Sequence, residues 1–156
     1  MKEAAEHSEA AESEVNMRID KDTYYLNIAE AVASRSTCLR KRYGAVIVNN
    51  DGIIATGYNG APRGEPNCCD VGECYCRAHN LPVSPDSAKH GEQYGACVAV
   101  HAEQNAIISA SRKDMQGATL YLACLSEGVD PIPCNICDRM IRNAGITRVV
   151  TRAGTF

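Results

Sequence analysis

The residues of this sequence best suited to metal chemistry are one histidine and two cysteines at two separate places. His101 precedes Glu103 by two positions at the start of an apolar helical pattern, and Cys134 and Cys137 stand at the start of another. The two cysteines are one helical turn apart, so both sulfurs fall on one face, and a helix amino end favours the thiolate form. These residues predict a zinc site with three protein ligands and an open fourth position.

Glu103 is the candidate proton carrier of this site. Water bound at an open zinc position has a pKa near neutrality, and a carboxylate two residues after a ligand can take the water's proton and return it to a substrate. Alone, His-x-Glu also fits a surface or capping role, and Cys-x-x-Cys also fits a redox or structural zinc site. Together, in this order on predicted helices, they match the H-x-E and P-C-x-x-C signature of zinc nucleobase deaminases.

Cys124 competes for a place among the zinc ligands, because it ends a predicted strand near the same helix starts. Its neighbours Tyr121, Leu122, Ala123 and Leu125 are almost all apolar. A lone cysteine in such a run is typical of a core position, and we interpret Cys124 as a core residue.

Alternating helical and strand patterns predict the elements that position these residues. A helix capped by Asp20 runs to about Arg35, and a hairpin joins two strands through the turn at residues 49–52. The hairpin strands are Gly44–Val48 and Ile53–Tyr58; later elements are a helix at 102–112, a strand at 119–125, a helix at 134–144 ended by Gly145, and a strand at 148–151. The order α-β-β-α-β-α-β predicts an α/β fold with a mixed sheet and helices packed on it.

Length and composition predict one folded domain preceded by a tail. The chain has 156 residues, of which 45% are hydrophobic, which suffices for a single core. Residues 1–16 are rich in Glu, Ala and Ser without an apolar stripe, so we expect a disordered acidic tail before a domain at 17–156. No apolar leader or membrane-length segment is visible, so we expect no membrane association and a cytoplasmic protein. Nine cysteines, an odd number, favour metal ligation over disulfides there.

Charge and aromatic content argue against a polynucleotide partner. The formal charge is -3, with seven Tyr, one Phe and no Trp, so neither a basic field nor a set of stacking platforms is expected. A small-molecule substrate is favoured, and a deaminase that edits tRNA or DNA is disfavoured because it would need a basic track.

From about Met17 to Arg152 the chain resembles the deoxycytidylate deaminase family. The resemblance lies in residues 35–38 (Arg-Ser-Thr-Cys), 57–64 (Gly-Tyr-Asn-Gly-Ala-Pro-Arg-Gly), 101–107 (His-Ala-Glu-Gln-Asn-Ala-Ile) and 133–137 (Pro-Cys-Asn-Ile-Cys). It implies a cytidine deaminase-like three-layer fold with helices on both faces of the sheet. It also implies hydrolytic deamination of dCMP to dUMP and ammonia, feeding dTTP synthesis, in a homo-oligomer, often a hexamer, under allosteric control by dCTP and dTTP.

The resemblance also assigns roles to single residues. Asn59 is expected to contact the substrate sugar, and the backbone around Ala102 to read the amine end of the base. Arg40 is the candidate for the 5′-phosphate, which an arginine can grip with two bonds, and Arg42 is the alternative. A turn role for Asn59 and a solvated surface role for Arg40 stay open. Arg112 stands at a family position linked to subunit contacts.

A second, structural zinc is implied for some members of the family. Ligands there come from the positions of Cys38 and Cys68, and Cys74 and Cys97 lie in the same irregular stretch, residues 60–97. Four thiolates would close a tetrahedral site and stabilise a loop that lacks its own core. Other residues are also near in sequence and leave the ligand set open: Cys69, Cys76, His79 and His90, whereas Gly91 and Ala99 stand where the family has its other known ligands.

Two departures from the family pattern and two kinds of alternative function accompany the resemblance. Residues 125–133 form a longer segment than the compact Ser-Pro-Cys form of many members, and the sequence stops at Phe156, short of a final strand and helix of several relatives. Rival enzymes sharing the metal motif act on free cytidine, guanine or a pteridine precursor. A non-catalytic, zinc-stabilised nucleotide-binding module is the remaining alternative, and Glu103 argues against it because a structural site needs no such carboxylate.

Overall fold

The computed structural model describes residues 18–81 and 96–156. The expected acidic tail at 1–16 and His90 and Gly91 lie outside these ranges. The described elements are α1 (Lys21–Ala33), β1 (Tyr43–Asn49), β2 (Gly52–Tyr58), α2 (Cys68–Val71), α3 (Tyr75–Ala78), α5 (Ala102–Ile108), β3 (Thr119–Cys124), α6 (Asn135–Ala144), β4 (Arg148–Thr151) and β5 (Gly154–Thr155). None of these helices is long and apolar enough to span a bilayer.

The strands form one mixed sheet in the order β2-β1-β3-β4-β5. β1 pairs antiparallel with both β2 and β3, β3 pairs parallel with β4, and β4 pairs antiparallel with β5. The predicted hairpin is confirmed: Asn50 and Asp51 adopt left-handed backbone angles, with φ of 48° and 61°, in the turn between β1 and β2. Register places the start of β1 beside the ends of β2 and β3, because Gly44 faces Tyr58 and Tyr43 faces Cys124.

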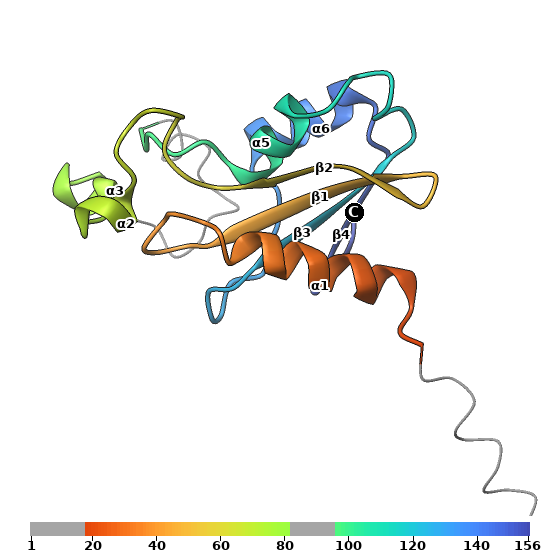
Figure 1. Ribbon diagram of the computed structural model, residues 1–156, viewed down its shortest axis with the longest axis horizontal. Helices are drawn as coiled ribbons and strands as arrows, with labels where there is room; N and C mark the ends of the chain where they lie inside the picture. The colour runs from red at the N-terminus through yellow and green to blue at the C-terminus, as the bar shows by residue number, and fades with distance from the viewer. Residues whose placement is uncertain (1–17, 82–95) are drawn as a thin grey trace, which may run out of the picture.

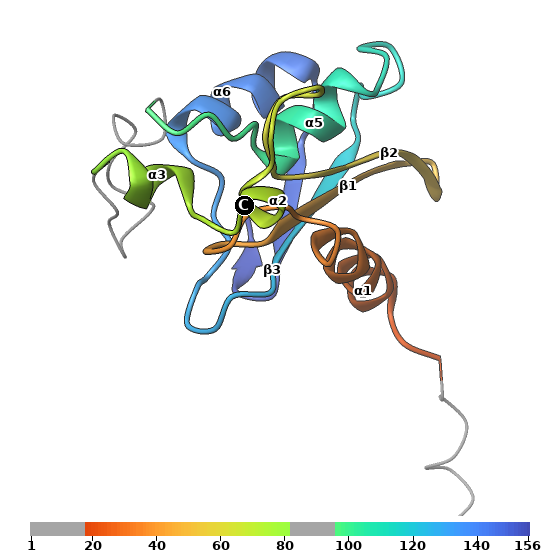
Figure 2. The ribbon, with the colours of Figure 1, turned by 60° about the vertical axis from the view of Figure 1, so that its left-hand side comes forward.

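Helices cover both faces of the sheet, with α1 on one side and α5 and α6 on the other (Figures 1 and 2). Side chains alternate accordingly along β1, where Val46 and Val48 pack with α1 while Ala45 and Ile47 pack with α5 and α6. β3 alternates in the same way, so each face of the sheet has its own core cluster. The three-layer α/β fold predicted from the element order and the family resemblance is confirmed.

Two glycines let a helix approach the sheet backbone on each face. A Cβ at Gly44 would lie 2.2 Å from the carbonyl oxygen of Ala29 in α1, and one at Gly57 would lie 2.3 Å from the amide nitrogen of Ala106 in α5. Any larger residue at Gly57 would therefore push α5 away from β2. Because α5 begins directly after His101, this close packing also places the histidine relative to the sheet.

Some boundaries differ from the sequence-based expectation. α1 ends at Ala33 rather than near Arg35, and α5 ends at Ile108 rather than at Arg112. After α5 the chain turns, and the side chain of Met115 is buried in the core at 3% exposure, which a continued helix would prevent. α6 ends as predicted, at Gly145 with φ of 89°. Within the irregular stretch, the short helices α2 and α3 lie off one end of the sheet (Figure 1).

Candidate active site

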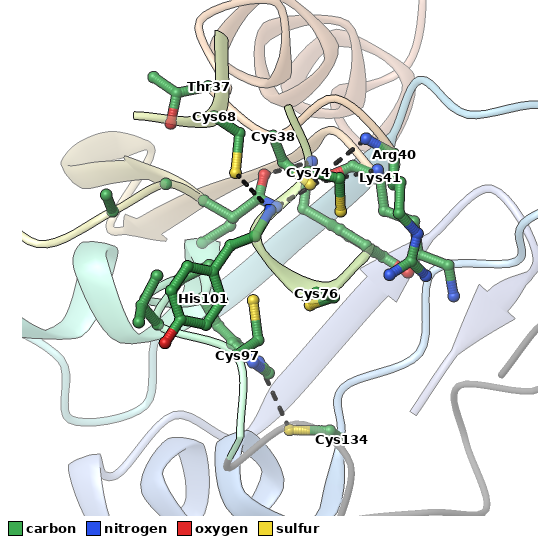
Figure 3. Close-up of a pocket in the computed structure, with 18 of the residues that line it drawn as sticks. Thr37, Cys38, Arg40, Lys41, Cys68, Cys74, Cys76, Cys97, His101 and Cys134 are labelled. Carbon is green, nitrogen blue, oxygen red and sulfur yellow. Dashed lines mark hydrogen bonds between the residues drawn. The ribbon is translucent and has the colours of Figure 1, made fainter. Parts of the chain in front are cut away.

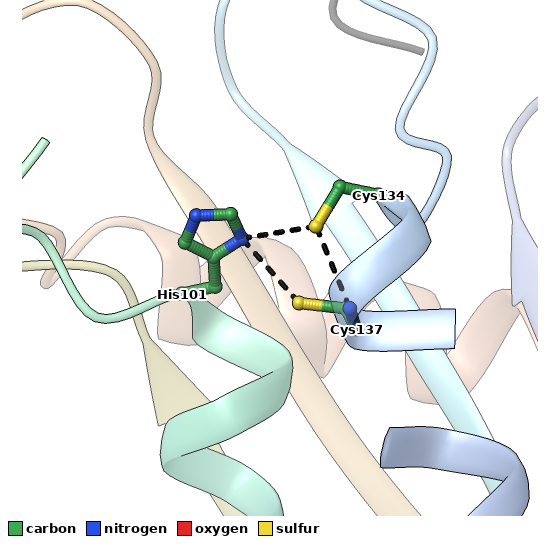
Figure 4. Close-up of side chains that lie close together, drawn as sticks. All are labelled: His101, Cys134 and Cys137. Carbon is green, nitrogen blue, oxygen red and sulfur yellow. Dashed lines mark hydrogen bonds between the residues drawn. The ribbon is translucent and has the colours of Figure 1, made fainter. Parts of the chain in front are cut away.

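His101, Cys134 and Cys137 converge at the amino ends of two neighbouring helices. His101 is the N-cap of α5 and Cys134 the N-cap of α6, and both have extended backbone angles that turn the side chain across the helix start. His101 Nδ1 lies 3.6 Å from Cys134 Sγ and 3.3 Å from Cys137 Sγ (Figure 4). In the described part of the chain, this is the one group of three or more His, Cys, Asp or Glu whose ligand atoms all lie within 4.8 Å of one another.

The spacing of these atoms fits one tetrahedral zinc ion. Zinc binds sulfur at about 2.3 Å and nitrogen at about 2.0 Å, so tetrahedral geometry separates a nitrogen ligand from a sulfur ligand by about 3.5 Å. The observed nitrogen-to-sulfur distances of 3.3 and 3.6 Å bracket that value. His101, Cys134 and Cys137 therefore have both the chemistry and the geometry of three zinc ligands.

The two thiols are electrostatically unequal in the metal-free protein. A hydrogen bond from the Cys137 thiol, opposed by burial and assisted by His101 and by the Cys137 backbone amide, lowers the pKa of Cys134 to about 4. The same hydrogen bond to Cys134, together with burial, raises the pKa of Cys137. Cys134 is therefore a thiolate at neutral pH, and metal binding would displace the remaining proton from Cys137.

Glu103 lies in the first turn of α5 and its side chain is almost fully buried, at 4% exposure. Burial raises the pKa of the Glu103 carboxyl, against the nearby charge of His101, which lowers it. Glu103 lines the same cavity as His101 and Cys134, without belonging to the ligand group. A buried carboxyl beside a metal site, rather than bound to the metal, is the arrangement that general acid–base catalysis requires.

One cavity connects the zinc ligands with the loop between α1 and β1 (Figure 3). On the catalytic side its lining includes Ala102, which is fully buried, as well as His101 and Glu103. The lining also includes Arg40 and Asn59. The structure thus places the first candidates for the base, sugar and phosphate contacts around the cavity that holds the catalytic group.

Asn59 is held by the protein through most of its amide. Its Oδ1 accepts hydrogen bonds from the Ser36 hydroxyl at 2.6 Å and the Tyr43 amide at 2.8 Å, and its Nδ2 donates to the Lys41 carbonyl at 2.8 Å. An asparagine amide can accept two hydrogen bonds and donate two, so one N–H is left for a ligand. Asn59 therefore ties the loop before β1 to the end of β2, in addition to the sugar contact that we expect from the remaining N–H.

Three consecutive basic residues in this loop point to different places. Arg40 and Lys41 line the cavity and are partly buried, whereas Arg42 is exposed, does not line it, and donates a hydrogen bond to the carbonyl oxygen of Ser34. The guanidinium of Arg40 also acts on Cys74, where burial raises the pKa of the thiol and Arg40 helps to lower it. The structure therefore favours Arg40 over Arg42 as a ligand of the 5′-phosphate.

The remaining wall of the cavity is a cysteine cluster, made up of Cys38, Cys68, Cys74, Cys76 and Cys97. Cys38 Sγ accepts from the amides of Arg40 and Lys41 at 3.4 and 3.5 Å, and Cys68 Sγ accepts from the amide of Tyr75 at 3.4 Å. Burial, with the charges of Cys38, Cys74 and Cys97, raises the pKa of Cys68. The four predicted ligands of the structural zinc, Cys38, Cys68, Cys74 and Cys97, thus line one cavity wall. Among the described residues, their sulfurs do not form a group as closely spaced as the catalytic one, whose ligand atoms lie within 4.8 Å of one another.

The alternative structural ligands are placed less favourably, with one exception. Cys76 belongs to the cluster, and burial followed by a hydrogen bond to Cys97 raises its pKa to about 12. Cys69 is exposed and His79 stacks on Tyr75, and neither lines the cavity. Cys124, interpreted as a core residue, also stays outside both the cavity lining and the catalytic group.

Sequence reasoning missed Lys41 and Ile132 as cavity residues. Both line the cavity, Lys41 from the loop before β1 and Ile132 from the segment 125–133, where the chain departs from the compact family form. Irregular loops have no periodicity that would indicate which side chain turns inward. The one available signal is proximity in sequence, to Arg40 in the first case and to Cys134 in the second.

Comparison with known proteins assigns the family. Residues 19–153 match the family model described as cytidine and deoxycytidylate deaminase zinc-binding region. The chain is 41% identical over 133 residues to the deoxycytidylate deaminase of Mycobacterium phage D29, covering 85% of this chain and 94% of the phage protein. It is 38% identical over 138 residues to the deoxycytidylate deaminase of Saccharomyces cerevisiae, of whose length it spans only 38%.

Solved structures agree with this assignment. The dCMP deaminase of cyanophage S-TIM5 in its apo form superposes with a TM-score of 0.61 at 28% identity, covering 87% of this chain and 85% of that chain. The same cyanophage enzyme in complex with dCMP and dUMP superposes with a TM-score of 0.59 at 28% identity, covering 87% of this chain and 83% of that chain. With the family model matched over most of the chain, and with these relatives in sequence and structure, the chain belongs to the cytidine and deoxycytidylate deaminase zinc-binding family.

Proposed function

We propose that this protein is a zinc-dependent enzyme that hydrolyses dCMP to dUMP and ammonia. The observation that carries the proposal is the cavity in which a zinc-ligand group, His101, Cys134 and Cys137, meets the buried carboxyl of Glu103. A relative of the same fold is known in complex with dCMP and dUMP. Arg40 in the lining of the same cavity supports a nucleotide over a nucleoside.

The reaction would use each wall of the cavity for one task. When held by His101, Cys134 and Cys137, zinc supplies a Lewis acid that brings the pKa of a water to about 7. Glu103 would take one proton from the water that attacks C4 and deliver it to the ring nitrogen N3. The same carboxylate would then take the proton of the hydroxyl newly bonded to C4 and deliver it to the amine, so that the C4–N bond breaks and ammonia leaves a C4 carbonyl. Its burial excludes bulk water from these transfers. The backbone at Ala102 and the free N–H of Asn59 would orient the base and the sugar.

The 5′-phosphate would be bound by Arg40. Arg40 lines the same cavity as the zinc ligands His101 and Cys134, and a charge-assisted bond to phosphate contributes about 1.5 to 3 kcal/mol. Arg40→Ala should therefore lower kcat/KM for dCMP about 10- to 150-fold, with a much smaller effect on deoxycytidine, which has no phosphate. An equal fall for both substrates would assign Arg40 to the support of Cys74 instead.

We also propose a structural zinc in the cysteine cluster, with Cys38, Cys68, Cys74 and Cys97 as its ligands. Backbone amides that donate to Cys38 and Cys68 stabilise thiolates, as the Cys137 amide does for Cys134 at the catalytic group. Burial raises the pKa of Cys74, but hydrogen bonds from two backbone amides and from Arg40 outweigh it and leave that pKa lowered. Cys76 is the competing fourth ligand, because it shares the cavity wall with Cys97.

The remaining parts of the proposal rest on the family alone. They are assembly into a homo-oligomer such as a hexamer, regulation by dCTP and dTTP, a cytoplasmic role in dTTP supply, and a domain spanning residues 17–156. Sedimentation with and without dCTP and dTTP, combined with activity at several dCMP concentrations, tests assembly and regulation together.

One assay tests the central proposal against its alternatives. Ammonia release is measured with dCMP, CMP, deoxycytidine and dCTP side by side, on protein loaded with zinc. Preference for dCMP supports the proposal, and preference for deoxycytidine would identify a nucleoside deaminase. Binding of dCMP without turnover of any of the four would identify a nucleotide-binding module.

A further inference from the structure

Lys41 occupies a position in the cavity that its own neighbours do not explain. It lies in the loop between α1 and β1, lines the cavity beside Arg40, and is only partly exposed (Figure 3). No carboxylate or other acceptor in residues 18–81 and 96–156 forms an ion pair or hydrogen bond with its ammonium group. A cation that lines a cavity without such a partner is available to an anionic group of a ligand that enters the cavity.

The charges around Lys41 favour an anion in this part of the cavity. Arg40 and Lys41 are adjacent in the chain and both line this part of the cavity, where the Cys38 sulfur accepts from the backbone amides of both residues. Glu103 is the one carboxylate among the described lining residues, and it belongs to the catalytic side. Two adjacent cations with no carboxylate beside them would both be stabilised by a dianion, which relieves their mutual repulsion.

Arg40 by itself is poorly placed to neutralise a phosphate dianion. Its side chain also interacts with Cys74, so its charge is shared with the cysteine cluster. Lys41 forms no side-chain hydrogen bond in the described part of the chain, and its backbone is held in place because its carbonyl accepts the 2.8 Å hydrogen bond from Asn59 Nδ2. Lys41 is thus the cation of the loop that is anchored at the backbone and free at the side chain.

We propose that Lys41 binds the 5′-phosphate of the substrate together with Arg40 and so sets the preference for a nucleotide over a nucleoside. This inference rests on the proposed deamination of dCMP. It adds a second cation to the phosphate site. The phosphate would then contact both the compact ammonium group of Lys41 and the planar guanidinium of Arg40.

The test compares Lys41→Met, Lys41→Arg and Arg42→Met in the zinc-loaded full chain. For each variant, kcat and KM are measured with dCMP and with deoxycytidine. Lys41→Met should reduce the ratio of the two kcat/KM values about 10- to 150-fold, mainly through KM for dCMP, and Lys41→Arg should restore most of it. Arg42→Met removes the same charge one residue away, from a side chain outside the cavity, and should leave the ratio within about twofold.

Inorganic phosphate supplies a second measurement that needs no turnover of a variant on dCMP. In the wild type, inorganic phosphate should compete weakly with dCMP. In Lys41→Met, where deoxycytidine turnover is measured, inhibition by inorganic phosphate should be lost. Equal losses for both substrates, with less zinc and a lower Tm, would overturn the proposal and assign Lys41 to the cysteine cluster. An unchanged ratio in Lys41→Met would also overturn it, and a wild type inactive on dCMP would instead refute the proposed function before any variant is compared.

Discussion

Replacement of Asn59 by alanine would test how the loop that carries the basic residues is held at the cavity. The side chain of Asn59 is 8% exposed and makes three hydrogen bonds of 2.6 to 2.8 Å, to Ser36, Lys41 and Tyr43. Alanine would remove the shared partner of all three groups at once. We expect the loop to loosen at both of its ends, because Ser36 and Tyr43 flank it.

The magnitude follows from the number of groups that lose their partner. A buried polar group left without a hydrogen bond costs about 1 to 3 kcal/mol, and water entering the space of the lost amide recovers part of this. We therefore expect Asn59→Ala to lower the free energy of unfolding by about 2 to 4 kcal/mol in total. For a chain of this length, that corresponds to a fall in Tm of about 4 to 16 °C.

The assay is urea unfolding of the wild type, Asn59→Ala and a control, Asn67→Ala, followed by circular dichroism. Asn67 also donates one side-chain hydrogen bond, to Asp70, but at an exposed position, so its loss should cost under about 1 kcal/mol. Because the loop carries Arg40 and Lys41, Asn59→Ala should also reduce the preference for dCMP over deoxycytidine. A loss of stability no larger than that of Asn67→Ala would refute the structural role and leave Asn59 as a substrate ligand only.

Three further outcomes are expected. Glu103→Gln should retain zinc but lose turnover by about 10²- to 10⁴-fold, and wild-type activity with full zinc content would contradict its role as proton carrier. Metal analysis should find about two zinc ions per chain, one lost in Cys134→Ser with the fold intact and one lost in Cys38→Ser with a lower Tm; one zinc, unaffected by Cys38→Ser, would exclude the structural site. The hydrogen bonds from Arg148, with that of Tyr121, hold the pKa of Asp22 below its ordinary value, so this stabilisation is present above about pH 4 and is lost as the pH falls through the lowered pKa. Below about pH 4, the Tm of Asp22→Asn should therefore depend less on pH than that of the wild type. The stabilisation lost should be under about 1 kcal/mol because both partners are half-exposed, and an unchanged acid profile would show that the pair does not contribute.

Structural features that depend on residues close together in the sequence could be predicted from sequence patterns. The hairpin between β1 and β2 follows from two apolar runs around Asn50 and Asp51, and the end of α6 follows from Gly145, because turn and cap geometry depends on local backbone sterics. The end of α5 did not follow, since it depends on burying Met115 against residues from other elements. Periodicity contains no information on such a contact.

The catalytic group was accessible to sequence reasoning for a chemical reason. Zinc accepts few side-chain types, and the spacing of Cys134 and Cys137 is dictated by one helical turn, so residue type and position alone nominate His101 and Glu103 as their partners. Tertiary structure added that the nitrogen-to-sulfur distances are 3.3 and 3.6 Å, the separation that a tetrahedral ion requires.

The phosphate side of the cavity, by contrast, depended on the fold. Arg40, Lys41 and Arg42 are consecutive cations in an irregular loop, and sequence reasoning chose Arg40, kept Arg42 as the alternative and missed Lys41. The structure separates them, because pairing of β1 with β2 and β3 anchors the loop at Asn59, turns Arg42 toward Ser34 and leaves Lys41 facing the cavity. Local sequence determines which chemistry a residue can perform, whereas the direction of a side chain in a loop is decided by long-range hydrogen bonds between segments that only folding brings together.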